Sequence, residues 1–246
     1  MAKKKEKEEF NLNDDLSDII IKSINDKFKG DNVAFYSDSL FDAPSEIKDW
    51  VPTGSTELDY AVSNRESGGW PVGRIVELTG MEASGKSLMC LHALKNTQQK
   101  GGLGVFIDTE NAFNIDFAEA IGLDTQKLLY IQLEKIEDCF ETIESILEKI
   151  NKVSKKRLVT IVLDSASGAT TEQELDSDYG KDGWSTSKAI ILSKAMRKIT
   201  NLIGRENALL IITNQLRQKL GVMFGDAECV DPFTTKIKIR YSLKNK

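Results

Sequence analysis

The sequence predicts an α/β fold, with a parallel sheet covered by helices on both faces, and two observations predict it. Short apolar runs rich in Val, Ile and Leu alternate with longer segments whose apolar residues recur at helical spacing. A glycine-rich phosphate-loop pattern lies between the first of these runs and the helical segment that follows it. Sheets of this kind bind their ligands beyond the carboxyl ends of the strands, so we expect a functional site at that edge.

The composition excludes several classes of protein. The chain has 246 residues, of which 40% are hydrophobic, and 33 basic against 38 acidic residues give a net charge of −5. No apolar run approaches the roughly 18 residues of a membrane-spanning helix, and residues 1–9 lack the apolar stretch of a signal peptide. The cysteines Cys90, Cys139 and Cys229 form no CxxC pair, which favours a reducing compartment, the cytoplasm. The single histidine, His92, cannot build a histidine-rich metal site.

Residues 1–35 are predicted to form a charged tail and one helix. Asn13 or Asp14 can cap this helix, which should end near Gly30. Its apolar positions, which fall at helical spacing, are Leu16, Ile19, Ile20, Ile24 and Phe28. Residues 31–70 contain several glycine and proline breakers, and we interpret them as a connecting region with short strands.

The regular part of the pattern begins at Arg74. The predicted strands are Arg74–Thr79, Gly104–Asp108, Leu128–Gln132, Leu158–Asp164 and Leu209–Thr213. The predicted helices between them are 86–99, about 114–121, 136–152 and 186–203. No internal repeat is visible, so the order of elements indicates one α/β core.

The phosphate-loop pattern is the strongest functional signal. It reads Gly80-Met81-Glu82-Ala83-Ser84-Gly85-Lys86-Ser87, follows a strand and opens a helix whose next residue is Leu88. Glycines let the loop wrap closely, so that backbone N–H groups and the helix N-terminus face phosphates. We expect residues 80–88 to contact ATP, with Lys86 on the β- and γ-phosphates and the Ser87 hydroxyl on Mg²⁺.

Three further polar residues end apolar strands and should meet the phosphates at the same edge of the sheet. Asp164 is predicted to complete the Mg²⁺ site, although an aspartate there can also cap the next segment. Glu110 can polarise the water that attacks the γ-phosphate, and Gln215 can contact that phosphate and register its loss. From position alone, Glu110 and Gln215 can equally be turn or helix caps.

The sequence resembles the RecA recombinase family, including its phage relatives. Besides the phosphate loop, the residues that carry the resemblance are Ser23–Gly30, Pro52–Ser55, Gly73–Glu77, Phe106–Ala112, Ala195–Lys198 and Asn214–Gly225. The resemblance implies a RecA-like P-loop NTPase core in an ATP-dependent strand-exchange protein that forms helical filaments on single-stranded DNA. The helix at 14–28 would then be the polymerisation helix, which packs on a neighbouring subunit.

By matching positions, the resemblance also implies roles for single residues. Glu110 would activate the water, and Gln215 would link ATP to the DNA-binding segment. Asn114 and Phe117 would contact adenine, at positions where the family usually has an acid and a tyrosine. Two loops would face DNA, one around 172–187 and one that begins after Gln215.

Basic residues support the second of these loops more than the first. Residues 186–219 contain seven basic residues and one acid, whereas residues 172–182 are acidic. Such a basic set favours salt-sensitive phosphate contact with little sequence preference. The predicted DNA-binding residues are Arg197, Arg217, Lys219, Met223 and Phe224. The alternative is a solvated basic helix face followed by two core residues.

Past Glu228 we expect the resemblance to stop. Residues 229–246 contain five basic residues and one acid, and they resemble the start of an intein with Cys229 as splicing nucleophile. We therefore expect the N-terminal fragment of a split intein, whose partner chain carries the C-terminal intein and the rest of the recombinase. The alternative is a truncated or divergent tail in which Cys229 is a small buried hydrophobe.

Together these observations divide the chain into 1–35, 36–228 and 229–246. The expected function is ATP-dependent DNA recombination with Mg²⁺, in a cytoplasmic protein with no membrane partner. Because the family's neighbouring subunit supplies cations to ATP, we expect the isolated chain to bind nucleotide and to hydrolyse it poorly. The alternatives are another RecA-like motor, such as a helicase-type ring, and an inactive splicing precursor.

Overall fold

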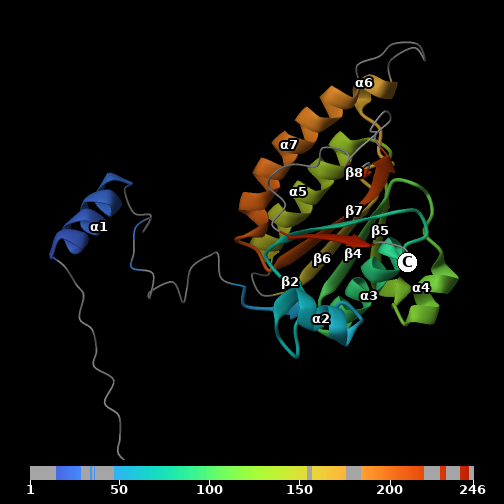
Figure 1. The fold of residues 1–246 in the computed structure, drawn as a ribbon, viewed down its shortest axis with the longest axis horizontal. Helices are drawn as coiled ribbons and strands as arrows, with labels where there is room; N and C mark the ends of the chain where they lie inside the picture. The colour runs from blue at the N-terminus through green and yellow to red at the C-terminus, as the bar shows by residue number, and fades with distance from the viewer. Residues whose placement is uncertain are drawn as a thin grey trace, which may run out of the picture. The chain divides into compact units, whose positions relative to one another are not determined.

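The structure is a computed structural model that describes residues 15–28, 34, 36, 47–153, 157–175, 184–218, 228–230 and 239–243. The chain divides into two units, Met1–Glu46 and Ile47–Lys246, and each is described by itself (Figure 1).

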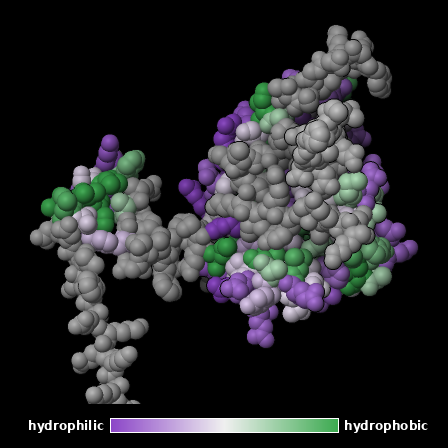
Figure 2. All heavy atoms as spheres, viewed as in Figure 1, coloured by the Kyte–Doolittle hydropathy of each residue, from purple (hydrophilic) through white to green (hydrophobic). Residues whose placement is uncertain are grey.

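The first unit contains helix α1 (Asp15–Lys27), which presents an apolar stripe. Leu16 and Ile19 are 60% and 64% exposed, and Figure 2 shows green apolar side chains gathered on this helix. The Asn25 side chain donates to the carbonyl oxygen of Ala34 and accepts its N–H, both at 2.9 Å. Helical spacing therefore predicted this element correctly, and the described residues of the unit leave its stripe uncovered.

The second unit is built on a parallel sheet, as the sequence predicts. Its strand order is β5-β4-β6-β7-β3-β9, and every neighbouring pair on this path is parallel. The strands are β3 (Ile75–Gly80), β4 (Leu103–Asp108), β5 (Leu128–Gln132), β6 (Val159–Asp164), β7 (Ala208–Gln218) and β9 (Ile239–Leu243). Their carboxyl ends meet at one edge, because Asp108 pairs with Asp164 and Gly80 with Gln215.

Helices cover both faces of this sheet (Figure 1). They are α2 (Thr56–Ser63), α3 (Lys86–Gln99), α4 (Ile115–Ile121), α5 (Ile136–Val153), α6 (Glu172–Leu175) and α7 (Trp184–Ile203). Helix α2 was not predicted, because the breakers around it obscured its signal. That signal is Ser55, whose side chain caps the helix by accepting the N–H of Leu58 at 3.4 Å.

The strands separate two apolar cores by the alternation of their side chains. Ile161 and Leu163 of β6 pack in the cluster that contains α5 and α7, whereas Val162 packs in the cluster that contains α3 and α4. In β7, Leu210 and Leu209 divide in the same way. Strands buried on both faces read as continuous apolar runs, which is why the sequence located them well.

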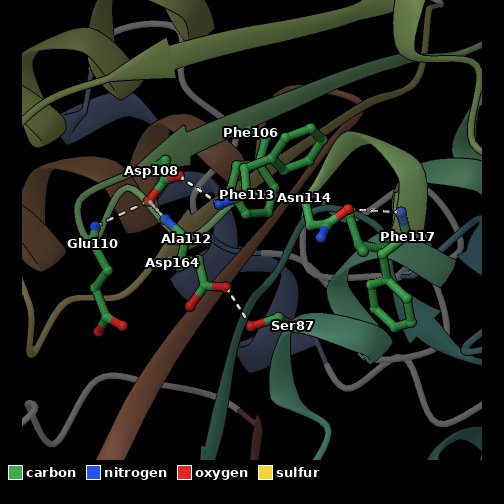
Figure 3. A pocket seen from close by; sticks show the side chains of 10 residues that line it. Ser87, Phe106, Asp108, Glu110, Ala112, Phe113, Asn114, Phe117 and Asp164 are labelled. Carbon is green, nitrogen blue, oxygen red and sulfur yellow. Dashed lines mark hydrogen bonds between the residues drawn. The ribbon is translucent and has the colours of Figure 1, made fainter. Parts of the chain in front are cut away.

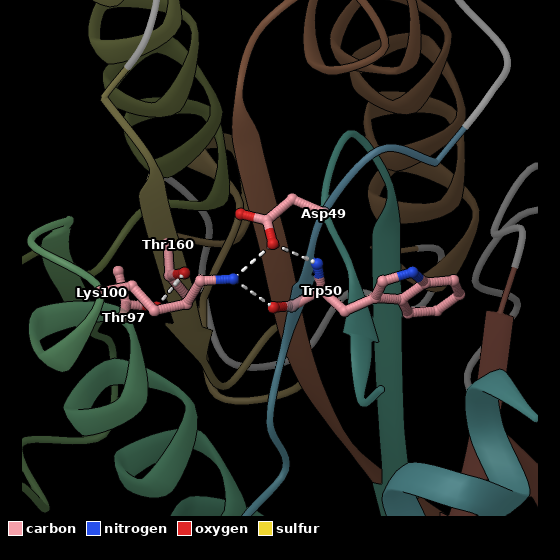
Figure 4. A network of polar contacts seen from close by, with 5 residues as sticks. All are labelled: Asp49, Trp50, Thr97, Lys100 and Thr160. Carbon is pink, nitrogen blue, oxygen red and sulfur yellow. Dashed lines mark hydrogen bonds and ion pairs between the residues drawn. The ribbon is translucent and has the colours of Figure 1, made fainter. Parts of the chain in front are cut away.

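A short antiparallel pair, β1 (Trp50–Val51) and β2 (Trp70–Pro71), attaches the start of this unit to α3. At the end of α3, Lys100 forms an ion pair with Asp49 and donates to the carbonyl oxygen of Trp50 at 2.7 Å (Figure 4). Earlier in the same helix, Thr97 of α3 shares a buried hydrogen bond of 2.5 Å with Thr160 of β6. These contacts fix the helix that follows the phosphate loop against both the sheet and the chain before it.

Two strands lie in the part of the chain predicted as an intein fragment. β8 (Glu228–Val230) pairs antiparallel with the end of β7, where Cys229 lies opposite Arg217. β9 pairs parallel with β3, from Val76 opposite Ile239 to Gly80 opposite Leu243. The described residues after Glu228, which are 229–230 and 239–243, therefore pair with strands of the core. Among the described helices, none is both long enough and apolar enough to cross a bilayer.

Candidate functional site

A pocket lies at the carboxyl ends of β4 and β6, beside the start of α3 (Figure 3). Its lining includes five residues that the sequence singled out, Ser87, Glu110, Asn114, Phe117 and Asp164. The remaining lining residues are Leu91, Phe106, Asp108, Ala112 and Phe113. The structure thus brings the predicted phosphate, metal and base positions to a single site.

The phosphate loop joins β3 to α3 through residues in left-handed conformations. Gly85 has φ 90° directly before the helix, and Ala83 has φ 56°. Lys86 folds over the loop, and its Nζ donates to the carbonyl oxygens of Gly80 at 3.2 Å and Met81 at 2.8 Å. The loop therefore closes around its own lysine, which is where a phosphate would meet both the cation and the helix N-terminus.

Asp164 and Ser87 lie together at the base of the pocket. The Ser87 hydroxyl donates to Asp164 Oδ2 at 2.6 Å, and the Thr213 hydroxyl donates to Asp164 Oδ1 at 2.5 Å. Each carboxylate oxygen thus receives one hydroxyl, from α3 on one side and from β7 on the other. The sequence predicted that Ser87 and Asp164 share one Mg²⁺ site, and the structure places them in contact. It gave no indication of Thr213.

The electrostatics of Asp164 suit a cation. Burial raises the pKa of its carboxyl, the hydrogen bonds from Ser87 and Thr213 lower it, and the charges of Glu110 and Asp108 raise it again. A bound Mg²⁺ would offset both the cost of burying the negative charge and the repulsion between the carboxylates. Among the described residues, no group of three or more His, Cys, Asp and Glu forms a metal site of its own. One hydroxyl and one carboxylate fit Mg²⁺, which keeps waters and substrate oxygens as its other ligands.

Glu110 is held between two strand ends. Its Oε1 accepts a short hydrogen bond from the Ser165 hydroxyl and lies 3.5 Å from Gln215 Nε2. Glu110 follows β4, Ser165 follows β6 and Gln215 lies within β7, so neighbouring strands place all three. The predicted pair of Glu110 and Gln215 is therefore brought into contact, although the sequence did not indicate Ser165.

Asp108 organises the loop that carries Glu110, and the sequence pattern assigned it no role. It is 1% exposed, and its carboxylate accepts the N–H groups of Glu110 at 3.0 Å and Phe113 at 3.1 Å. It also accepts the hydroxyl of Tyr130 at 3.0 Å, and burial followed by this contact raises the pKa of that tyrosine. The sequence signal that could have identified Asp108 is a carboxylate at the end of a strand, directly before a turn.

Asn114 and Phe117 are placed at the outer part of the pocket. The Asn114 side chain caps α4 by accepting the N–H of Phe117 at 2.9 Å (Figure 3). Phe117 is 47% exposed, which leaves its ring available to a ligand. The cap uses one lone pair of Asn114 Oδ1, so the amide N–H groups and the second lone pair remain for a ligand.

The basic residues expected to meet DNA do not form one set. On α7, Lys188 donates to two backbone carbonyls, and Lys198 pairs with Glu144 of α5 at 2.5 Å. Arg197 is exposed on the same helix, whereas the backbone of Arg217 lies in β7. The count of basic residues in the sequence gave each of these cations the same weight. The structure shows that two of them bind to other groups within the fold.

Several predicted residues lie outside the described part of the chain. They are Lys219, Met223 and Phe224, together with the side chains of Arg217 and Cys229. The other two cysteines, Cys90 and Cys139, are free and buried.

The chain is similar to known proteins over most of its length. A family model described as the RecA N-terminal domain matches residues 17–240. Protein RecA of Chloroherpeton thalassium is 39% identical over 178 residues, which cover 72% of this chain and 47% of that protein. Protein RecA of Synechocystis is 39% identical over 189 residues (77% and 50%), and that of Mycoplasma pneumoniae 39% over 212 residues (83% and 60%). The chain spans about half the length of the curated relatives it matches. Since the family match continues to residue 240, the expectation that the resemblance stops at Glu228 was wrong.

Proposed function

This chain belongs to the RecA N-terminal domain family, and we propose that it is the ATP-binding core of a RecA-type recombinase that acts in DNA recombination and repair. The observation that carries the proposal is one constellation at the carboxyl edge of the sheet. Ser87 and Asp164 lie 2.6 Å apart, and Glu110 Oε1 lies 3.5 Å from the Gln215 amide. A family core with this arrangement is suited to binding and hydrolysing ATP.

The binding half of the site consists of the loop and the two oxygen ligands. Lys86 and the N-terminus of α3 would neutralise the phosphates, while the Ser87 hydroxyl and Asp164 carboxylate would hold Mg²⁺. When bound, Mg²⁺ supplies positive charge that stabilises the transferred phosphoryl group. Thr213 keeps the carboxylate turned toward Ser87, through its own contact of 2.5 Å.

The hydrolytic half consists of Glu110 and the groups that hold it. A carboxylate at this position can accept a proton from the attacking water, and the Ser165 hydroxyl and Gln215 amide fix the oxygen Oε1. Because Gln215 lies within β7, a change at the γ-phosphate would be transmitted along this strand to the segment after Gln218. That segment and the exposed Arg197 are the proposed contacts to single-stranded DNA.

Self-association into filaments is part of the same proposal. The uncovered stripe of α1 has the character of an interface, and Leu16 and Ile19 expose most of their side-chain surface. A helicase-type motor would instead close into rings. Electron micrographs of the chain with ATP and single-stranded DNA separate the two, since rings would contradict the recombinase proposal.

The direct test measures nucleotide binding and DNA-dependent hydrolysis on the same preparation. We expect a fluorescent ATP analogue to bind in the presence of Mg²⁺, and Lys86→Ala to weaken that binding by at least about ten-fold. Single-stranded DNA should raise hydrolysis, however slow the basal rate. A chain that binds DNA but no nucleotide would contradict the proposal.

Trans-splicing is a second candidate, and Cys229 directly after Glu228 is the observation that favours it. In the proposed step the Cys229 sulfur attacks the Glu228 carbonyl carbon, the C–S bond forms, the C–N bond breaks, and the freed amine takes the thiol proton. The family match to residue 240 and the pairing of β9 with β3 weigh against it.

Two variants distinguish the alternatives for these residues. If residues 229–246 belong to the core, removing them uncovers the edge of β3 and lowers both thermal stability and ATP binding. If they are an intein fragment, their removal leaves both unchanged, and the intact chain forms a ligated product with its partner chain. Cys229→Ala should then abolish ligation.

A further inference from the structure

The turn that follows β6 contacts the Glu110 carboxylate. Ser165 Oγ, which donates to Glu110 Oε1, also accepts the N–H of Gly168 at 3.0 Å and lies 2.9 Å from Ser167 Oγ. The turn is anchored on its far side, where Thr170 donates its N–H to the carbonyl oxygen of Glu134 at 2.9 Å. The position of the Glu110 carboxylate therefore depends on how this turn is folded.

Gly168 brings the turn into direct contact with Glu110. A Cβ atom added at Gly168 would lie 2.6 Å from Glu110 Cγ and 2.9 Å from its Oε1. Such contacts are far inside van der Waals distance, so any larger residue would push the carboxylate or the turn away. The absence of a side chain at 168 is what lets the carboxylate reach Ser165.

Among the described side chains of helix α7, Lys188 forms hydrogen bonds to this turn. Lys188 is half-buried, and its Nζ donates to the carbonyl oxygens of Ser167 at 3.2 Å and Ala169 at 2.6 Å. The two carbonyls flank Gly168, so the ammonium group clamps the part of the turn that touches Glu110. Ordering a lysine side chain costs rotamer entropy, which this pair of charge-assisted hydrogen bonds offsets.

We propose that Lys188 is a positioning residue for Glu110: it ties α7 to the Ser165–Ala169 turn and so fixes the carboxylate in the site. This inference rests on the proposed function, in which Glu110 activates water. It adds a second structural route to Glu110, from α7 through the turn, beside the contact with Gln215. A displacement of α7 would then loosen the carboxylate without touching the nucleotide.

The first measurement is independent of activity. Hydrogen exchange of the peptide that covers residues 165–171 is compared between the wild type, Lys188→Met and Lys149→Met, an exposed lysine of α5. Methionine keeps the length of the lysine and removes its donors. We expect exchange of this peptide to become about ten-fold faster in Lys188→Met and to stay unchanged in the control. Equal protection in all three proteins would overturn the proposal.

The second measurement separates binding from turnover. In Lys188→Met we expect kcat for ATP hydrolysis to fall by about ten- to one hundred-fold, with nucleotide affinity within about two-fold of the wild type. Lys188→Arg should restore much of the rate, because it returns a cationic donor to the carbonyls. Gly168→Ala should lower kcat in the same way, by displacing Glu110 directly.

The outcomes distinguish this inference from the proposed function. A wild-type chain that binds ATP but hydrolyses none overturns the role of Glu110, while hydrogen exchange still decides whether Lys188 holds the turn. A wild-type chain that hydrolyses ATP, together with a Lys188→Met variant of equal kcat, overturns the positioning role alone. A fall in thermal stability of Lys188→Met without rescue by Lys188→Arg would also count against it.

Discussion

Replacing Thr213 by valine should both destabilise the core and weaken the metal site. Thr213 is 0% exposed, and its hydroxyl donates to Asp164 Oδ1 at 2.5 Å. Valine has nearly the same shape, so the change removes the hydroxyl without opening a cavity. A hydrogen bond to a charged acceptor contributes about 1.5–3 kcal/mol, and we expect the free energy of unfolding to fall by that amount. For a domain of this size the melting temperature should drop by about 3–12 °C.

The loss of unfolding free energy in Thr213→Val should be largest at neutral pH and smaller in acid. The hydrogen bond from Thr213 lowers the pKa of Asp164, so its loss raises further a pKa that burial has already raised. The bond stabilises the ionised carboxylate, and its contribution is present at neutral pH and lost as the carboxyl is protonated. Urea unfolding of Thr213→Val and the wild type should therefore differ most at neutral pH and converge in acid.

A matched control comes from the neighbouring strand. Thr160 is also fully buried, and its hydroxyl pairs with that of Thr97 at 2.5 Å, away from the carboxylate (Figure 4). Thr160→Val removes a neutral hydrogen bond, so it should cost about 0.5–1.5 kcal/mol and leave the Mg²⁺ dependence of ATP binding unchanged. Thr213→Val should raise the Mg²⁺ concentration needed for ATP binding by about ten-fold. Equal losses in the two variants, or an unchanged Mg²⁺ requirement in Thr213→Val, would refute the assigned role.

Other predictions address the remaining parts of the structure. Glu110→Gln should lower single-turnover ATP hydrolysis by at least about one hundred-fold without weakening nucleotide binding, whereas Glu148→Gln on α5 should change neither. Ile20→Glu should prevent self-association in analytical ultracentrifugation, because it places a charge in the apolar stripe of α1, and Lys22→Glu on the opposite side should not. Burial raises the pKa of Cys139 to about 12, so peptide mapping should find this thiol modified by a neutral-pH reagent only after unfolding.

The sequence predicted the elements whose side chains are buried on both faces. The predicted strand Leu128–Gln132 coincides with β5, although this edge strand is mostly exposed. The buried runs ending at Asp108 and Asp164 end where β4 and β6 end. The boundaries at Asp108 and Asp164 were predictable because a charged residue inside a strand buried between two helical layers is costly. Glu77 is an exception within β3, where its carboxylate accepts a hydrogen bond from Asn214 at 3.2 Å. The same logic predicts that Glu110 and Gln215 lie at one edge of the sheet, where their side chains do meet.

The supporting contacts of the site were not predictable in the same way. Ser165 and Thr213 are small polar residues next to apolar strands, a pattern that fits turns and caps equally well. Their partners lie 55 and 49 residues away along the chain, so only the strand order brings them together. Lys188 was only one of the seven basic residues of the 186–219 stretch for the same reason: a sequence shows the charge of a lysine but not the carbonyl oxygens that it contacts.

Strand order also explains why these residues act on one another. β7 lies between β6 and β3, so its segment around Thr213–Gln215 is adjacent to the proposed Mg²⁺ ligand Asp164 on one side and in register with the phosphate loop on the other, where Gln215 pairs with Gly80. Thr213 and Gln215 are two residues apart and point to the same face of the strand. One of them holds the metal ligand and the other lies beside Glu110, so a shift of β7 must alter both contacts together. Lys188 acts on Glu110 from the other side, through the Ser165–Ala169 turn. The position of the carboxylate therefore depends on both β7 and α7.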